Sequence, residues 1–427
     1  MSENSKGREL AYICLVDDIT PIENADRLEL AHIRGWQCVV GKGEFNKGDL
    51  AVYFETDAQL PNVEPFSNME FLAKKHFKIK IQKIRGVLSN GLLVPVSAFG
   101  WELDNSRSKP SVITKRYTSG ETGERLFERD GLTERLGVTY NEPEDNVRKA
   151  PSSDKYKKMA ARHHKLFRNP IIKWIYKKKW GKKLLFVFFG KKSDRKTAFP
   201  SWVVKTDEGR IENEPWVLQD KNPWIASEKI DGTSSTYSVK KLKKNKYVYY
   251  VCSRNVVMLT QEYVWKKNRW EVVGKTKQKD PNETYYKQDF YTEMSEKYNI
   301  SEVLLDIARN YNEEYVTFQG ETFGQNVQKR DYNLNHRELR GFNLIFASKG
   351  RLGSIEGAAI MKEYDIPWVP IVNDNYILPD TIEELKQYAA GKSVIDGGMR
   401  EGLVFRSLDG KKSFKCVDDA FVYQYHR

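Results

Sequence analysis

The chain has 427 residues, of which 40% are hydrophobic and 30% charged, a composition typical of a globular protein with more than one core. Lys and Arg exceed Asp and Glu by 71 to 58, and the net charge of +13 favours an anionic partner such as a nucleic acid. The longest strongly apolar run, residues 184–189, is far shorter than the roughly 20 residues of a membrane span. The polar N-terminus lacks the hydrophobic segment of a signal peptide.

Residues 10 to about 100 predict an all-β unit. Short runs with strand-like alternation are separated by turns that carry Gly and Pro; they include Leu10–Val16, Ala51–Phe54 and Phe77–Ile84. Residues 132–143 are expected to close the same unit. Many short strands are typical of a small barrel or sandwich, so we assign residues 1–146 to this unit.

Residues 147–198 form a basic segment rich in aromatic residues. Between Arg162 and Lys196 there are thirteen Lys and Arg residues and one acid, Asp194. Basic side chains neutralise phosphates and aromatic rings stack on bases, which predicts a nucleic-acid contact that includes Lys177, Lys178 and Lys179. A solvated loop without a specific partner and a helix at a membrane surface are the alternatives.

Residues 199–427 predict a mixed unit of strands and helices. Strands are expected at residues 224–230, 235–240, 315–320, 403–407 and 413–417. Ser301 is a plausible N-cap for an amphipathic helix, and a second helix over residues 381–390 should end at Gly391.

The sharpest local motif in the chain is Lys229-Ile230-Asp231-Gly232-Thr233-Ser234. A lysine between two strands, followed by a small polar turn, suits a lysine nucleophile. Because a free lysine has a pKa of about 10.4, we expect neighbouring cations or a bound metal to lower the pKa of Lys229. Taken alone, the motif describes equally well a β-turn with a surface lysine.

Further polar and aromatic residues follow this motif in a fixed order: Arg254 in a Ser-Arg-Asn triplet, Glu321 after Phe-Gln-Gly, Phe342 after Gly341, Glu401 before Gly402, and Lys415 in Ser-Phe-Lys-Cys. This order resembles the covalent nucleotidyltransferase superfamily, which comprises polynucleotide ligases and mRNA capping enzymes. The resemblance covers about residues 224–417. The superfamily often has a second lysine two positions after Lys415, where this chain has Val417, so only Lys415 is assigned a role.

The resemblance implies a role for each residue. Lys229 would attack the α-phosphate of a nucleoside triphosphate, with Arg254 and Lys415 as further catalytic residues on the phosphates. Glu321 and Glu401 would contact ribose and bind Mg²⁺ or Mn²⁺, which prefer oxygen ligands. Phe342 would stack on the base, although it could equally be a core residue. The implied nucleotide-binding set comprises Glu228, Lys229, Ile230, Asp231, Gly232, Arg254, Glu321, Phe342, Glu401 and Lys415.

The position of Lys415, 12 residues before the C-terminus, leaves no room for the OB barrel that follows this motif in DNA ligases and capping enzymes. The N-terminal β unit instead resembles the OB-type domain that precedes the transferase domain in the fifth RNA ligase family. The implied fold is α+β: an OB-type β-barrel, then a mixed α/β, ATP-grasp-like nucleotidyltransferase domain on antiparallel sheets. Residues 199–427 would be this adenylyltransferase domain.

The implied activity is that of an ATP-dependent RNA ligase in RNA repair. It would seal 5′-phosphate and 3′-hydroxyl RNA ends through lysyl-AMP and an adenylylated RNA end. Basic residues of the OB unit, namely Lys78, Lys80, Lys83 and Arg85, are a second expected RNA surface.

We expect a monomer in the cytoplasm, or a viral protein in the host cytoplasm. The four cysteines lie far apart without metal-ligand spacing, which indicates reduced thiols. A DNA ligase, a capping-type guanylyltransferase, and a nucleic-acid-binding protein with a decayed transferase site are the alternatives.

Overall fold

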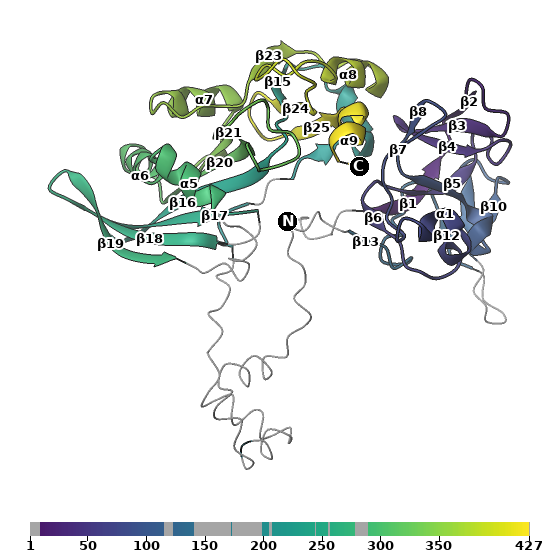
Figure 1. The fold of residues 1–427 in the computed structure, drawn as a ribbon, viewed down its shortest axis with the longest axis horizontal. Helices are drawn as coiled ribbons and strands as arrows, with labels where there is room; N and C mark the ends of the chain where they lie inside the picture. The colour runs from purple at the N-terminus through teal and green to yellow at the C-terminus, as the bar shows by residue number, and fades with distance from the viewer. Residues whose placement is uncertain are drawn as a thin grey trace.

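The computed structural model describes residues 9–114, 123–140, 199–204, 207–243, 245–254, 257–277 and 289–426, together with Ile172. These residues form a smaller N-terminal domain and a larger C-terminal domain, which lie side by side in Figure 1. Lys177, Lys178 and Lys179 of the basic segment lie outside the described residues. The domain boundaries near residues 146 and 198 stay predictions.

The N-terminal domain is all-β, as its alternating sequence predicts. Its central strand β5 (Leu50–Phe54) pairs with β1 (Ala11–Leu15) and β9 (Leu92–Pro95), and every residue of β5 is buried. Two hydrophobic clusters share β5, one on each of its faces. The remaining strands are β2 (Asp18–Pro21), β3 (Leu28–Ile33), β4 (Trp36–Gly41), β6 (Ala58–Gln59), β7 (Gln82–Ile84), β8 (Val87–Ser89), β10 (Glu102–Asp104), β11 (Ser111–Ile113), β12 (Arg125–Leu126) and β13 (Thr139–Tyr140), with one short helix, α1 (Glu70–Ala73).

The strand predicted over residues 77–84 forms only in part. His76 and Phe77 have positive φ angles of 52° and 58°, which no extended strand can accommodate, and the regular strand is reduced to β7. Arg85 lies in the β7–β8 turn with φ 49°. The basic side chains of this stretch, Lys78, Lys80, Lys83 and Arg85, nevertheless lie outside the core, while the intervening Ile79 and Ile81 are buried.

The C-terminal domain contains two sheets. The larger has the strand order β19-β18-β17-β16-β20-β21-β22, and the smaller has the order β14-β25-β24-β15-β23. All pairings are antiparallel except β14 with β25. The strands of the larger sheet are β16 (Thr233–Lys243), β17 (Lys246–Cys252), β18 (Val257–Lys266), β19 (Arg269–Lys277), β20 (Tyr315–Gly324), β21 (Arg337–Phe346) and β22 (Gly350–Arg351). Those of the smaller sheet are β14 (Gly209–Arg210), β15 (Trp224–Glu228), β23 (Ile371–Tyr376), β24 (Gly402–Ser407) and β25 (Ser413–Val417).

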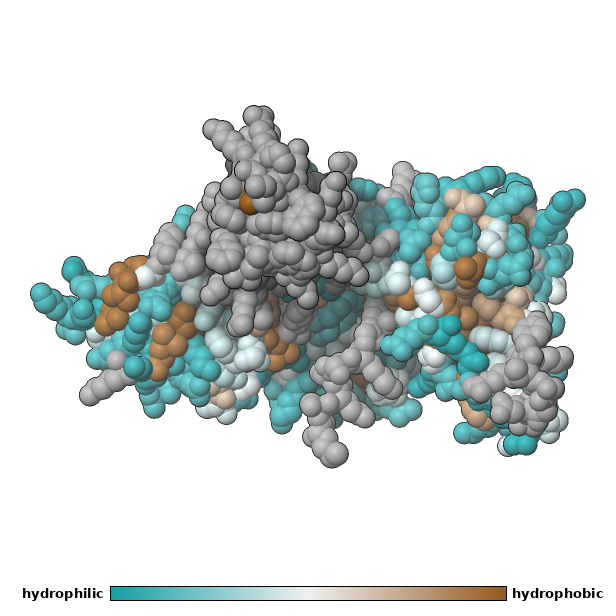
Figure 2. Space-filling model, turned by 90° about the horizontal axis from the view of Figure 1, so that it is seen from below, coloured by the Kyte–Doolittle hydropathy of each residue, from teal (hydrophilic) through white to brown (hydrophobic). Residues whose placement is uncertain are grey.

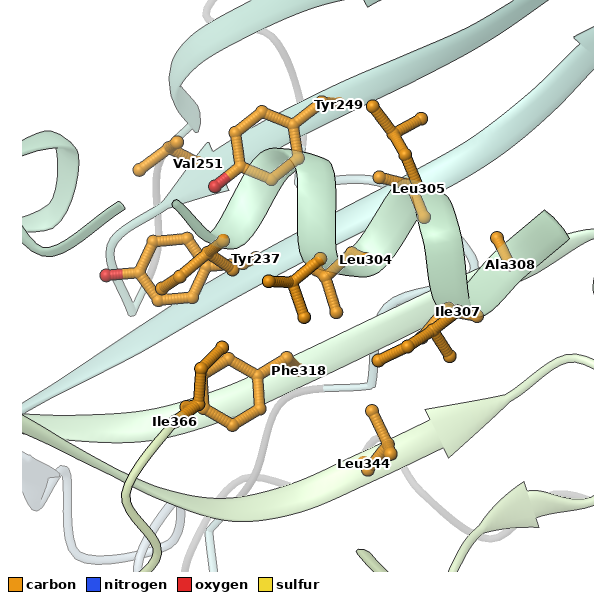
Figure 3. Close-up of a cluster of buried hydrophobic side chains, with 14 of the residues drawn as sticks. Tyr237, Tyr249, Val251, Leu304, Leu305, Ile307, Ala308, Phe318, Leu344 and Ile366 are labelled. Atoms are coloured by element: carbon orange, nitrogen blue, oxygen red, sulfur yellow. The ribbon is translucent and has the colours of Figure 1, made fainter. Parts of the chain in front are cut away.

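Helices cover these sheets: α5 (Phe290–Lys297), α6 (Ile300–Asn310), α7 (Ser354–Lys362), α8 (Ile382–Ala389) and α9 (Asp419–Tyr425). Figure 3 shows how α6 packs on the larger sheet, with Leu304 and Ile307 directed toward Tyr237 of β16 and Phe318 of β20. The apolar residues of α6 recur at helical spacing, which gives the helix one face to bury.

The predicted N-cap of α6 is wrong. Asn299, in the left-handed conformation with φ 49°, precedes the first helical residue, and Ser301 lies inside the first turn. Asn tolerates this conformation better than most residues, so the local backbone favours it at the entry. The predicted helix at residues 381–390 is confirmed as α8, whose N-cap Thr381 accepts a hydrogen bond from the Glu384 N–H.

One contact between the two domains joins α8 to the β3–β4 turn and the start of β4. Lys386 of α8 donates a 2.7 Å hydrogen bond to the Gly35 carbonyl, and its Nζ lies 5.0 Å from the centre of the Trp36 ring. The same ammonium forms ion pairs with the buried Glu212, at 2.9 Å, and with Asp419 of α9, at 3.0 Å. In Figure 1, α9 lies on the side of the C-terminal domain that faces the N-terminal domain.

The face of the molecule in Figure 2 is mainly hydrophilic. Separate hydrophobic patches occur toward the end that carries β18 and β19, where Val272 and Val273 are half exposed. Within the described residues, no helix combines the length and hydrophobicity needed to cross a membrane.

Candidate active site

Lys229 directly follows β15 and precedes β16, so the predicted position between two strands is confirmed. Its N–H donates a 3.0 Å hydrogen bond to the carbonyl of Gly402 on β24. Gly402 has φ 148°, and a Cβ atom there would lie 2.2 Å from the Cys416 carbonyl oxygen, so only glycine fits. The neighbouring Glu228 is buried, and its carboxylate accepts hydrogen bonds from Ser393 and from the Val394 N–H. The structure therefore uses Glu228 to hold a loop beside Lys229.

The turn after Lys229 lies directly against β20. A Cβ atom at Gly232 would lie 2.3 Å from the Thr322 carbonyl oxygen, so the close approach requires glycine. Two residues further on, Ser234 of β16 pairs with Glu321 of β20. This register places the Glu321 carboxylate near Lys229.

Lys229 and Glu401 form the central contact of the site. Lys229 Nζ lies 2.7 Å from Glu401 Oε1, and both side chains are largely buried. Burial lowers the pKa of Lys229, but the carboxylates of Glu401 and Glu321 outweigh it and hold that pKa above its ordinary value. Neighbouring cations do not lower the pKa of Lys229 below its ordinary value, contrary to the expectation from the sequence, because the carboxylates dominate the charge around the amine. A lowering by a bound metal stays a prediction.

Three acids, Glu321, Glu401 and Asp231, lie around the Lys229 amine. Burial raises the pKa of Glu321 to about 8; Lys229 opposes this rise, and the charges of Glu401 and Asp231 add to it. Glu401 Oε2 and Asp231 Oδ2 are buried without a hydrogen-bond partner in the described part of the chain. A bound cation would favour the ionised forms of these acids.

The donors present fit the predicted Mg²⁺ or Mn²⁺. Among the described residues, no group of three or more His, Cys, Asp or Glu side chains is arranged to hold a metal. Magnesium is commonly bound by only one or two carboxylates, with substrate phosphates and water completing its shell. Glu321 and Glu401 could supply such a pair.

Lys415 and Arg254 are brought together by an acid that the sequence analysis did not select. Asp207 Oδ1 lies 3.0 Å from Lys415 Nζ, and Asp207 Oδ2 lies 3.3 Å from the Arg254 guanidinium. Burial lowers the pKa of Lys415, with Asp207 opposing that effect and Lys229 adding to it. The Asp207 carboxylate thus forms ion pairs with both Lys415 and Arg254, the two cations that are predicted to hold phosphates.

Phe342 and Ile230 lie in a small apolar cluster next to Lys229. The cluster comprises the buried Ile230, Phe323, Tyr332 and Val369, with Phe342 packed against it. Phe342 stays partly exposed, and the Arg406 guanidinium lies 5.7 Å from its ring centre. A partly exposed ring beside the lysine is compatible with stacking on a base.

Two further residues of the site, besides Asp207, were missed by the sequence analysis. His426, just after α9, has its Nε2 3.2 Å from Asp231 Oδ1. Tyr332 accepts a 2.7 Å hydrogen bond from the Asp231 N–H. Both lie about a hundred or more positions from Asp231 in the chain, and no local pattern connects them to it.

Comparison with known proteins identifies a family-model match in each of the two domains. Residues 222–417 match the family model described as RNA ligase, and residues 10–96 match an OB-fold domain model. No curated protein sequence matches the chain.

Solved structures of an RNA ligase from Naegleria gruberi resemble the whole chain. The complex with pyrophosphate is 23% identical, covers 98% of this chain and 99% of its own, and has a TM-score of 0.64. A mutant with AMP and manganese is 24% identical with the same coverage and a TM-score of 0.65. A mutant with ATP and manganese is 24% identical, covers 97% and 99%, and has a TM-score of 0.64. These likenesses confirm the predicted fold: the chain carries a domain that matches the RNA ligase family model behind a domain that matches an OB-fold model.

Proposed function

We propose that this RNA ligase uses ATP to join a 5′-phosphate RNA end to a 3′-hydroxyl RNA end. The observation that carries the proposal is the pairing of Lys229 with Glu401 inside the RNA ligase domain, with Glu321, Arg254 and Lys415 around it. Two of the Naegleria ligase mutant structures contain AMP or ATP with manganese, which supports ATP and a divalent cation as the ligands here.

Lys229 performs the first step as a nucleophile. Its uncharged amine attacks the α-phosphate of ATP; an N–P bond forms, the bond to pyrophosphate breaks, and the amine loses a proton. Lys415 and Arg254 stabilise the charge that develops on the phosphate oxygens. Because Asp207 pairs with both cations, it must release them when the phosphates arrive.

The next two steps return Lys229 to its starting state. A 5′-phosphate oxygen of RNA attacks the lysine-bound phosphorus, the N–P bond breaks, and the amine regains a proton. A 3′-hydroxyl then attacks the adenylylated 5′-phosphate and releases AMP, which leaves a phosphodiester bond. A divalent cation held by Glu321 and Glu401 would neutralise phosphate charge and favour the uncharged amine.

Incubation with α-labelled ATP or GTP, followed by a denaturing gel, tests the first step. We expect label from ATP with the wild-type chain, none with Lys229→Ala, and wild-type labelling with Lys411→Ala, whose side chain is exposed on the β24–β25 turn. Labelling by GTP alone would establish a guanylyltransferase, and an unlabelled wild-type chain would indicate a decayed site. Covalent label on Lys229→Ala would remove Lys229 from its assigned role.

A panel of RNA and DNA ends tests the substrate. We expect sealing of 5′-phosphate to 3′-hydroxyl RNA, with slower sealing of DNA. Faster sealing of nicked DNA would favour the DNA ligase alternative. The basic residues Lys78, Lys80, Lys83 and Arg85 support an RNA-binding role for the OB-fold domain, because they lie outside its core.

We also propose a monomer that acts in the cytoplasm, of a cell or of a virus-infected host. The free, buried state of its four cysteines supports a reducing compartment. Sedimentation with and without RNA would test the monomeric state.

A further inference from the structure

Helix α9 begins beside the reactive pair. The strand before it, β25, carries Lys415, and the Asp418 N–H donates a 2.8 Å hydrogen bond to the carbonyl of Glu401. Phe421 of α9 is fully buried, and the Arg330 guanidinium lies 5.7 Å from its ring centre and 4.2 Å from that of Tyr332. The helix is therefore packed against the residues that surround the Lys229 turn.

The end of α9 delivers His426 to the carboxylate of Asp231. The Asp231 side chain is almost fully buried, and His426 Nε2 lies 3.2 Å from its Oδ1. The other oxygen, Oδ2, is buried and has no hydrogen-bond partner within the described ranges. His426 donates this hydrogen bond whether its ring is protonated or is the neutral Nε2–H tautomer.

The position of Asp231 in the turn explains why a hydrogen bond from His426 would matter. It lies two residues after Lys229, and its charge acts on both Lys229 and Glu401. An unanchored carboxylate can rotate toward the lysine amine and compete with Glu401 for it. A nucleophile gives its full rate only when it is held close to its attack geometry.

We propose that His426 is a positioning residue for adenylylation, which holds the Asp231 carboxylate and so keeps the Lys229–Gly232 turn in the shape that aims the amine. The inference rests on the proposed function, since it concerns the same lysine. The helix that carries His426 is also tied to the OB-fold domain, because Lys386 contacts both Asp419 and Gly35. The position of His426 therefore depends on contacts made by α9, which lie outside the Lys229–Gly232 turn.

The experiment compares two steps in four proteins: wild type, His426→Ala, His426→Gln and Gln424→Ala. Gln424 is exposed on the same helix and serves as the matched control. For His426→Ala, we expect lysyl-AMP formation at saturating ATP to slow by on the order of tenfold, with the KM for ATP changed less than about twofold. Sealing of RNA adenylylated beforehand should stay within about twofold of wild type, because that step needs no nucleophilic lysine.

His426→Gln should recover most of the rate, because its amide N–H can still donate. The His426 side chain is 36% exposed, so imidazole from solution can reach the space that His426→Ala leaves. Added imidazole should therefore also accelerate adenylylation by this variant. A wild-type rate for His426→Ala would overturn the inference. If His426→Ala slowed lysyl-AMP formation and the sealing of adenylylated RNA equally, and also lowered the unfolding temperature, the role of His426 would be merely structural and the inference would be overturned. A wild-type chain that forms no adduct would overturn the proposed function first, and this inference with it.

Discussion

Asp207 holds the two cations that are expected to receive phosphates. Its carboxylate lies 3.0 Å from Lys415 Nζ and 3.3 Å from the Arg254 guanidinium, and its side chain is 60% exposed. Because exposed ion pairs contribute only about 0–1 kcal/mol, phosphates can displace it at little cost. The acid therefore keeps Lys415 and Arg254 in place and competes weakly with the nucleotide.

Replacement of this acid should tighten nucleotide binding. We expect Asp207→Asn to lower the KM for ATP in the adenylylation assay by about fivefold or less, because both cations are freed. Asp409→Asn, which neutralises an exposed acid on the β24–β25 turn, is the matched control and should leave the KM unchanged. A raised KM for Asp207→Asn would show that the acid assists binding and does not compete with it.

Glu208, the next residue, stabilises the fold in a pH-dependent way. Burial raises the pKa of Glu208. The Arg406 and Arg351 guanidiniums and the Ser413 hydroxyl lower it by a larger amount, so the pKa of Glu208 lies below the usual 4.5. Since the folded pKa is below the unfolded one, this stabilisation is complete above pH 4.5 and is lost as the pH falls through the folded value.

Urea unfolding across this pH range should detect the effect. We expect Glu208→Gln to cost about 3 kcal/mol at neutral pH, since it leaves the buried Arg406 without its charge partner. The variant should also lose less stability than wild type as the pH falls below 4.5. Glu134→Gln, at an exposed position in the OB-fold domain, should keep the wild-type pH profile.

At the scale of elements, α8 carries Lys386, which contacts the OB-fold domain at Gly35 and Trp36. Its start is fixed by Thr381, whose hydroxyl accepts a hydrogen bond from the Glu384 N–H. We expect Thr381→Ala to lower the free energy of unfolding by about 1 kcal/mol, and Thr381→Ser to keep most of it. Chemical denaturation measures both values. Equal stability of the two variants would mean that the cap contributes nothing.

Comparison of predicted and observed elements shows which features local sequence patterns can predict and which depend on the folded structure. The strand over residues 413–417 was predicted with its observed bounds, because in β25 the buried Phe414 and Cys416 alternate with the partly exposed Ser413 and Lys415. The strand over residues 77–84 was shortened by left-handed backbone at His76 and Phe77, which no propensity scale indicates. The local motif selected Lys229 and the resemblance to nucleotidyltransferases selected Glu401, and the structure brings the two side chains together. Neither selected His426, because that contact depends on how α9 packs in the finished fold.

At the scale of the whole molecule, the four cysteines are buried in both domains. Burial raises the pKa of Cys252 to about 12, and it raises the pKa of the other three as well. Because the thiolate is the reactive form, we expect no alkylation of the folded protein at neutral pH and four labelled thiols in denaturant. Mass spectrometry after treatment with a thiol reagent gives the count. Rapid labelling of the native chain would show that one of these cores opens readily.

The smaller sheet of the C-terminal domain has a consequence for synthesis on the ribosome. Its order, β14-β25-β24-β15-β23, places the late strands β24 and β25 between the early strands β14 and β15. Those two late strands carry Lys415 and the backbone partner of Lys229. A nascent chain therefore cannot complete the adenylylation site until residue 417 has left the exit tunnel. A polypeptide that terminates before β25 is expected to be inactive.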